Sequence, residues 1–386
     1  MKIIIILKED IKHFPPVLTV INALVDLKHE VRVIGDYSDD AQKQELLNAG
    51  VKFYNTGIYD VNVSQLQKLK STFTFRKRVN RIIREMRLEN EENYYLWIFQ
   101  SHNIALLYKL IGKYPSILHP LEFTGNIIKP GYRLLSPFFN IGKTYRMAAK
   151  VVNCEYNRAQ ITKGLYNLSR LPFVMPNKMY MADDKLQSPP KEILAKVEEL
   201  KSRLKDKRVI LYQGIFCQDE RRLNEFCEAI KVLGPDYVFL ILTPRLPQRE
   251  TLEKEYASSP QFIFLDFIQP PYHLLITQLA HIGILTYFPD SKNISRVINP
   301  LYCAPNKIFE YGKFGIPMLG NNIPGLYYIF QQYKCGITFD YPPSVEKIAE
   351  DIRYIFDNYP EYSKGSRDYY KSVDIKKIIS SILEEK

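Results

Sequence analysis

Apolar runs and helical segments alternate along the first 178 residues of the chain. Residues 3–7 are apolar at every position, which is typical of a strand buried on both faces of a parallel sheet. The next segment, 15–30, has its apolar side chains at helical spacing. Six further runs are predicted to be strands: 31–35, 51–57, 94–100, 116–121, 150–155 and 171–177. This βαβ alternation predicts a parallel sheet.

A polar stretch with Pro189 and Pro190 separates this pattern from a second one. Further strands are predicted within 209–214, 237–242, 261–267, 283–288, 316–319 and 335–340, and helices within 221–233 and 271–282. We expect an α/β protein with two Rossmann-like, doubly wound parallel-sheet domains, 1–180 and 181–365. A C-terminal helix, 366–386, should pack back on the first domain. Because ligands bind beyond the carboxyl ends of such strands, the expected site is a cleft that the two domains face.

The composition is that of a globular protein, with 46% hydrophobic and 25% charged residues among 386. No apolar run approaches the roughly 18 residues that a membrane span requires. Residues 3–7 are too few for the core of a signal peptide. The cysteines show no metal-ligand or disulfide spacing, which favours a cytoplasmic location; they are Cys154, Cys217, Cys227, Cys303 and Cys335.

The net charge of +11 comes from the first half of the chain. Residues 1–178 contain 26 Lys and Arg against 15 Asp and Glu, whereas the remainder has 27 of each. The segment 70–87 is rich in basic residues, and as a helix it would gather Phe75, Val79 and Ile83 on one face. Such a helix can lie on an anionic membrane surface, which we expect at the inner face of the membrane. Alternatively, its apolar face packs on its own domain. Nucleic acid is not an expected partner, because no aromatic-basic recognition motif is present.

Two cationic segments follow predicted strands of the second sheet. Arg221 and Arg222 come after a strand that ends at Gly214, and Lys307 lies in the first turn of a later helix. Helix N-termini and arginines both bind phosphate, and Glu310, one turn further on, can accept the hydroxyls of a ribose. Together these residues favour a nucleoside diphosphate ligand. Each has a simpler alternative: the arginines as surface charges, and Glu310 as an acid that interacts with the helix dipole.

At this point the sequence resembles the GT-B glycosyltransferases, specifically glycosyltransferase family 4, the retaining group 1 enzymes. The family signature is a Pro-Asn-Lys or Pro-Ser-Lys, then a helix with Glu, then Gly-x-Pro. It stands here as Pro305-Asn306-Lys307, Glu310 and Gly315-Ile316-Pro317. The segment from "LYQG" to Arg221 resembles the diphosphate-binding turn of the family. A looser similarity in the first half extends the resemblance over nearly the whole chain.

The resemblance implies a metal-independent, hexosyltransferase-like enzyme without a cofactor. It would move a sugar, with retention, from a nucleotide-diphosphate sugar to a glycan or polyprenyl-linked acceptor in cell-surface polysaccharide synthesis. The implied catalytic residues are His119, Arg221 and Lys307, and the implied donor-nucleotide residues are Gly214, Arg221, Pro305, Asn306, Lys307 and Glu310. A gapless alignment places Leu121 in the position of His119. Glu122 and His13 are the acceptor-side candidates.

This chain departs from the family pattern at several positions. The first of two glutamates that the family often carries falls at Tyr302, which cannot replace a carboxylate. Residues 14–16, Phe-Pro-Pro, stand where many members carry a glycine-rich loop, and Asp183 and Asp184 lack the Asp-x-Asp pattern of a metal site. A nucleotide-sugar epimerase with the same fold and a non-catalytic partner subunit therefore stay open as alternatives.

Overall fold

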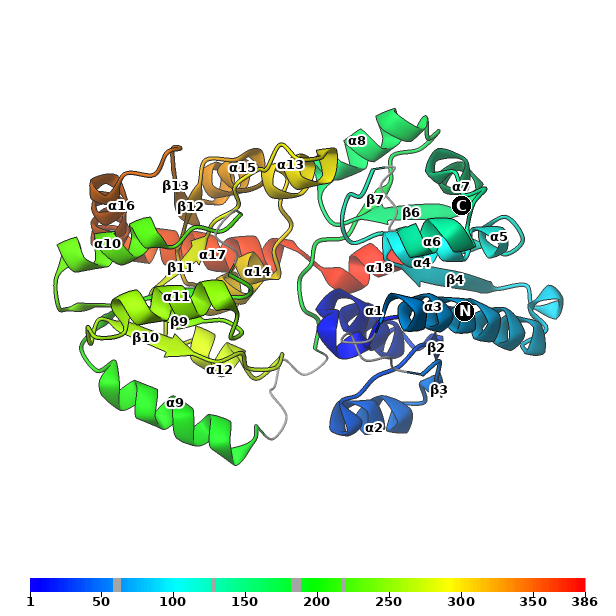
Figure 1. Ribbon diagram of the computed structural model, residues 1–386, viewed down its shortest axis with the longest axis horizontal. Helices are drawn as coiled ribbons and strands as arrows, with labels where there is room; N and C mark the ends of the chain where they lie inside the picture. Colours follow the sequence, from blue (N-terminus) through cyan, green and yellow to red (C-terminus); the bar gives the residue numbers. More distant parts are fainter. Residues whose placement is uncertain (58–63, 126–129, 182–188, 217–219, 386) are drawn as a thin grey trace. The chain divides into compact units, whose positions relative to one another are not determined.

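The computed structural model describes residues 1–57, 64–125, 130–181, 189–216 and 220–385. The chain divides into two compact units (Figure 1): unit 1 comprises Met1–Asp184 with Asp374–Lys386, and unit 2 comprises Lys185–Val373. Cys217, Asp183 and Asp184 lie outside the described residues. The other four cysteines are buried and form no disulfide bond within the described part of the chain.

Within the described residues, unit 1 is built on a seven-stranded parallel sheet in the order β3-β2-β1-β4-β5-β6-β7. All seven predicted strands are confirmed: β1 (Lys2–Ile6), β2 (Glu30–Ile34), β3 (Lys52–Tyr54), β4 (Tyr94–Phe99), β5 (Ser116–His119), β6 (Lys150–Asn153) and β7 (Phe173–Val174). Ile5 of β1 is opposite Val33 on one side and Trp97 on the other. Because neighbours cover β1 at both edges and both faces, all five of its residues are buried.

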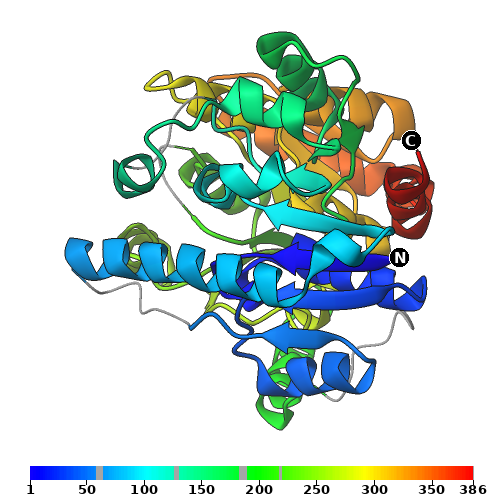
Figure 2. The same cartoon turned by 90° about the vertical axis from the view of Figure 1, so that its right-hand side faces the viewer.

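Helices join these strands in unit 1. They are η1 (Ile11–His13), α1 (Pro15–Asp26), α2 (Asp40–Asn48), α3 (Gln65–Glu85), η2 (Leu88–Asn90), α4 (Ser101–Leu106), α5 (Tyr108–Ile111), α6 (Pro130–Leu135), α7 (Ile141–Met147) and α8 (Tyr156–Tyr166). The longest of those named, α3, begins with a reciprocal capping box between Ser64 and Gln67. Figure 2 shows that α3 projects beyond the strands at one end.

The chain returns to unit 1 through α18 (Ile375–Glu384), which packs on α1. Lys150 donates to the carbonyls of Leu383 and Glu385 at 3.3 and 2.5 Å, so a buried cation holds the C-terminal end of the helix. Lys376 of α18 also pairs with Asp26 of α1 at 2.9 Å. The boundary predicted at 365 lies inside α17 (Tyr359–Ser372), which packs on α14 (Asn306–Phe314) and belongs to unit 2.

Unit 2 contains, in its described part, a six-stranded parallel sheet in the order β10-β9-β8-β11-β12-β13. The strands are β8 (Arg208–Gln213), β9 (Tyr237–Leu242), β10 (Phe262–Leu265), β11 (Ile282–Leu285), β12 (Met318–Asn321) and β13 (Gly336–Phe339), as predicted. Leu211 and Leu240 enter one apolar core, and Ile210 and Phe239 enter a second. Successive side chains of a strand point to opposite faces, so a sheet covered on both faces needs the continuous apolar runs of this sequence.

The remaining helices of unit 2 are α9 (Lys191–Arg203), α10 (Asn224–Leu233), α11 (Pro247–Tyr256), α12 (Leu274–Thr277), α13 (Ile294–Leu301), α15 (Pro324–Tyr333) and α16 (Val345–Asp357). Two of the predicted helices are shorter than expected. The first, α10, begins after the two arginines and not at them. The second, predicted over 271–282, is reduced to α12, because His281 already donates its N–H to Val209 of the sheet.

Candidate functional site

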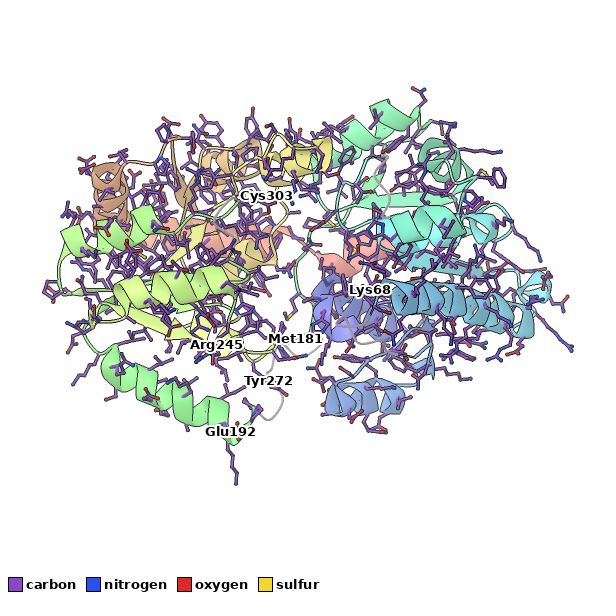
Figure 3. All side chains as sticks on the ribbon, viewed as in Figure 1. Lys68, Met181, Glu192, Arg245, Tyr272 and Cys303 are labelled. Carbon is purple, nitrogen blue, oxygen red and sulfur yellow. The ribbon has the colours of Figure 1, made fainter. Side chains whose placement is uncertain are left out.

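The carboxyl edge of the unit 2 sheet gathers charged side chains where β8 and β11 meet. From β8 the chain continues through β9 to β10 at one edge of the sheet. From β11 it continues through β12 to β13 at the other edge. Ligands of open parallel sheets bind at such a switch point. Three segments converge there: the end of β8, the loop before α10, and the start of α14. In Figure 3, Cys303 marks the approach to α14 and Tyr272 marks the segment before α12.

Lys307, in the first turn of α14, carries a buried amino group without a hydrogen-bond acceptor in the described part of the chain. Its Nζ lies 4.5 Å from the ring centre of Tyr212 and 5.4 Å from that of Tyr287. Burial lowers the pKa of Lys307 well below its ordinary value, and Arg221 lowers it further, against the opposing effect of Glu310. The aromatic faces favour a cation, but a buried charge without an acceptor is unfavourable. The position is suited to an incoming anion.

The two neighbouring arginines contact different rings. Arg221 lies over the ring of Tyr287 at 5.5 Å, the same ring that Lys307 contacts. Arg222 lies over Phe288 at 5.4 Å. Arg221 therefore shares the surroundings of Lys307, and its role at the diphosphate stays a prediction. It is also half-buried, so the interpretation as a freely solvated surface charge does not fit it.

Gly214 lets the backbone pass close to this amino group. Its φ of 113° is a conformation that glycine adopts readily and other residues rarely do. A Cβ atom at this position would lie 3.6 Å from Nζ of Lys307. The glycine thus turns the chain at the end of β8 and leaves the space beside the amino group free of a side chain.

Glu310 is held from two sides by other segments of unit 2. Its Oε1 lies 3.2 Å from Nε2 of His273, and its Oε2 accepts a hydrogen bond from Nε2 of Gln213 at 2.5 Å. Burial raises the pKa of Glu310, but His273, the bond from Gln213 and the charge of Lys307 together bring it below its ordinary value. The carboxylate is ionised and fixed in place, as an acceptor for ligand hydroxyls needs to be. Its two partners come from other segments of unit 2, so the interaction of Glu310 is not limited to the dipole of its own helix.

His273 and Gln213 are site residues that the sequence did not identify. Thr277 donates to Oε1 of Gln213 at 2.8 Å, which orients the amide nitrogen of Gln213 toward Glu310. Gln213 could have been identified from the sequence, because it is a polar residue at the end of an apolar strand. Nothing in the sequence around His273 indicates the site, since only the tertiary structure brings the start of α12 to α14.

The first two residues of the Pro305-Asn306-Lys307 signature shape the start of α14. Pro305 is the N-cap with an extended backbone, Asn306 is the first helical residue, and no side chain of the described residues caps the helix. The N–H groups of its first turn add to the positive potential near Lys307. Tyr302 stands where the family often has its first glutamate, and it cannot supply a carboxylate. It follows the last residue of α13 and is half-buried.

His119 lies in the core of unit 1. It is the last residue of β5 and is fully buried, with its ring centre 5.0 Å from that of Phe99 and its Nε2 3.7 Å from Sγ of Cys154. Burial lowers the pKa of His119 to about 3, so the ring is neutral near pH 7. The ring has no exposed atoms, and the rings of Trp97 and Phe99 lie beside it. The structure therefore corrects the expected role: His119 is a core histidine.

The acceptor-side candidates Glu122 and His13 are exposed residues of unit 1. His13 ends η1 and Glu122 follows β5. Leu121, the alternative position for the histidine, is buried and has a φ of 63°. An acceptor-side role for Glu122 and His13 stays a prediction.

The basic segment 70–87 lies largely in α3, and its apolar face belongs to the core of unit 1. Phe75, Val79 and Ile83 are buried in the cluster that also holds Ile4 and Ile98. This face cannot enter a bilayer unless the unit unfolds, so the alternative in which it packs on its own domain is confirmed. No helix in the described ranges is long and apolar enough to cross a membrane.

Comparison with solved structures identifies the fold, whereas no family model and no curated protein matches the sequence. HepE from Anabaena, in complex with UDP and glucose, has a TM-score of 0.64 and 13% identity, over 100% of this chain and 98% of that one. WaaG, a glycosyltransferase involved in lipopolysaccharide biosynthesis, has 0.60 and 12%, over 100% of both chains. A glycosyltransferase from Rickettsia africae has 0.64 and 13%, over 100% and 99%. The chain has the GT-B fold.

Within unit 2 of this GT-B chain, the structure brings donor-site candidates together. Gly214, Arg221, Lys307 and Glu310 converge at one edge of unit 2. The remaining candidates, His119, Glu122 and His13, belong to unit 1. The predicted fold class is confirmed.

Proposed function

We propose that the protein is a glycosyltransferase that moves a sugar from a nucleotide-diphosphate sugar to a glycan or lipid-linked acceptor. The observation that carries this proposal is the buried amino group of Lys307, which has no acceptor in the described part of the chain and lies beside Arg221. A diphosphate would supply that acceptor, and the ionised Glu310 would hold the ribose. The solved structure of HepE with UDP-glucose, which shares the fold, supports the same ligand class.

The proposed chemistry relies on cations of the chain. As the bond between the sugar and the diphosphate breaks, negative charge grows on the leaving oxygen, and Lys307 and Arg221 stabilise it in a site of low polarity. The acceptor hydroxyl attacks the anomeric carbon on the face that the diphosphate leaves, and its proton passes to a phosphate oxygen. The configuration is retained, and the products are the glycosylated acceptor and the nucleoside diphosphate.

A thermal-shift screen against a panel of nucleoside diphosphates tests this function. A ligand at about 100 times its dissociation constant should stabilise the protein by about 2.7 kcal/mol. A panel in which no nucleoside diphosphate raises the melting temperature would contradict the proposal. Incubation with the identified nucleotide sugar alone distinguishes the epimerase alternative, since an epimer formed without acceptor would favour it.

Binding of the nucleotide sugar should take up a proton. The groups that face the amine of Lys307 are Arg221, Tyr212, Tyr287, Glu310 and Cys303. In the free protein burial depresses the pKa of Lys307, and a bound diphosphate raises it by favouring the charged form. Between these two pKa values the affinity should fall as the pH rises. Calorimetry between about pH 6 and pH 9, in buffers of different ionisation enthalpy, measures this uptake.

The nucleotide sugar is preferable to a nucleoside diphosphate in that experiment, because each of its phosphates has one ester and one anhydride bond and therefore does not titrate near neutrality. Lys307→Met, which removes the titrating amine, should abolish the uptake. A constant affinity and no proton exchange over the whole range would show that the amine does not change its charge on binding.

A membrane partner remains part of the proposal, but on a different surface from the buried face of α3. The surface, here called the α3–α6 surface, lies where α3 packs on α6, and Arg76 of α3 donates to the carbonyl of Leu135. Its exposed apolar side chains are Leu66 (79% exposed), Phe73 (48%), Leu134 (67%) and Phe138 (84%). Its exposed basic side chains are Lys70, Lys77 and Arg133. Exposed apolar groups among cations suit an anionic bilayer at which a lipid-linked acceptor would be held.

The protein is therefore expected to sediment with anionic liposomes at low salt and to be released at high salt. Each Lys or Arg near the surface contributes about 1 kcal/mol, so Lys70, Lys77 and Arg133 changed together to Gln should abolish most of the binding. Phe138→Ser should also weaken it. Tyr328→Ser, at an exposed aromatic residue of unit 2, is the matched control and should bind as the wild type does. Equal sedimentation with neutral and anionic vesicles, or none with either, contradicts the prediction.

A further inference from the structure

Two cations of the donor edge share one aromatic ring. Arg221 lies over the ring of Tyr287, 5.5 Å from its centre, and Nζ of Lys307 lies 5.4 Å from the same centre. The cations come from different segments, the loop before α10 and the first turn of α14. Tyr287 follows β11 and so reaches both of them from a third segment. It has no part in the chemistry proposed above.

Two like charges beside one ring repel each other. Burial lowers the pKa of Lys307, and the charge of Arg221 lowers it further, so the two cations interact unfavourably in the free protein. The face of an aromatic ring carries partial negative charge and attracts cations within about 6 Å of its centre. The ring of Tyr287 therefore offsets part of this repulsion. Burial raises the pKa of Tyr287 well above its ordinary value, so its phenol is neutral.

The backbone of Tyr287 is held by the side chain of Asn321. Oδ1 of Asn321 accepts a hydrogen bond from the N–H of Tyr287 at 2.8 Å, and Nδ2 of Asn321 donates to the carbonyl of Tyr287 at 2.6 Å. Asn321 is buried and is the last residue of β12, whose pairing with β11 ends at Leu285 and Gly320. Its amide thus continues the contact between the two strands beyond the last backbone pair.

Tyr212 supports the same amine in a different way. Its ring lies nearer to Nζ of Lys307, at 4.5 Å, and its phenol donates to the carbonyl of Ile215 at 2.7 Å. Tyr212 is therefore fixed by the turn after its own strand, β8. Tyr287 differs, because its ring contacts two cations together and its backbone is fixed by a neighbouring strand. A change at Tyr287 should therefore affect both cations.

We propose that Tyr287 is a positioning residue of the donor site, which holds Arg221 and Lys307 together for the diphosphate. Asn321 acts through Tyr287 by fixing its backbone. Cations that are oriented before the ligand arrives bind it at a lower cost in free energy. This inference rests on the proposed function, since it concerns the site for the diphosphate. The nucleoside part of the ligand, assigned to Glu310, should not depend on the ring.

Isothermal calorimetry with the nucleoside diphosphate found by thermal shift tests the role of the ring. Tyr287→Leu removes the ring and keeps an apolar side chain, so it should weaken binding about tenfold. Tyr287→Phe keeps the ring and should bind as the wild type does. Tyr341→Leu is the matched control, because it removes an aromatic ring beside Arg222, which has no assigned role. It should also bind as the wild type does.

The nucleoside without phosphates separates positioning from packing. In an NMR titration it should bind equally to the wild type and to Tyr287→Leu, which also reports that the variant is folded. If Tyr287→Leu does not fold, Tyr287→Met takes its place. An equal loss for nucleoside and nucleoside diphosphate would mean that Tyr287 only supports the fold, and would overturn the inference. The inference also fails if Tyr287→Leu is silent, or if Tyr287→Phe is as damaging as Tyr287→Leu.

A double-mutant cycle tests Asn321. Asn321→Ala should weaken nucleoside diphosphate binding in the wild-type background and add no further loss to Tyr287→Leu. If Asn321→Ala does not fold, Asn321→Ser replaces it, since its hydroxyl can still accept from the N–H of Tyr287. Equal losses in the two backgrounds would show that Asn321 does not act through Tyr287. A wild type that binds no nucleoside diphosphate would instead contradict the proposed donor site, and this inference with it.

Discussion

Replacement of Lys307 by methionine should lower kcat by about 10²–10³-fold and change KM much less, by analogy with the loss of one donor from an oxyanion hole. Charge on the leaving diphosphate grows in the transition state, so a cation that stabilises it acts mainly on the chemical step. Methionine preserves most of the volume between Tyr212 and Tyr287, which limits the effect on folding. Steady-state release of nucleoside diphosphate measures both constants.

Two arginine variants accompany this experiment. Arg221→Gln should also lower kcat more than it raises KM, because Arg221 contacts the same ring as Lys307. Arg222→Gln is the matched control, since Arg222 lies over Phe288 and has no assigned role. A rise in KM alone for Lys307→Met would mean that the amine binds the ground state only. If Arg222→Gln lowers kcat and Arg221→Gln does not, the residue that stabilises the leaving diphosphate is Arg222 and not Arg221.

Replacement of Glu310 by alanine should weaken nucleoside diphosphate binding by about 1.5–3 kcal/mol, the usual contribution of a hydrogen bond to a charged group. The carboxylate that accepts the ribose hydroxyls is lost. Gln213 and His273 also lose the partner that fixes their side chains. Turnover at low donor concentration should fall in parallel. Isothermal calorimetry with the ligand found by thermal shift gives the affinity.

His273→Ala separates these two contributions. It leaves the carboxylate and the hydrogen bond from Gln213 in place, so it should weaken binding less than Glu310→Ala does. Circular dichroism should confirm that each variant is folded. An unchanged affinity in folded Glu310→Ala would show that the carboxylate only supports the fold of unit 2.

Most of the fold could be predicted from the sequence because its strands are buried on both faces. Continuous apolar runs as short as 3–7 and 237–242, in a chain of this composition, are typical of strands inside a parallel sheet. Helix extents were less predictable. The predicted helix over 271–282 has suitable apolar spacing, yet the chain must extend by His281 to pair with Val209, and only α12 forms.

The donor-site candidates could be found in the sequence because they are local to strand ends and helix starts. The spacing of Lys307 and Glu310 on one helix, and of Arg221 after Gly214, places cations and an acid at one edge of a parallel sheet. A residue that reaches the site from a segment outside these motifs could not be identified from the sequence. His273 contacts Glu310 across 37 positions of the sequence, and only tertiary packing sets that distance to 3.2 Å.

The sequence alone thus determined the parallel sheets, the division into two halves and the cationic edge of the second half. Each of these follows from apolar periodicity or from short spacings along the chain. Tertiary structure alone decided which faces are covered. It buried His119 against Phe99, and it placed the apolar side of α3 in the core of unit 1. Periodicity shows that a helix has an apolar face, but the burial of that face depends on residues distant in the chain.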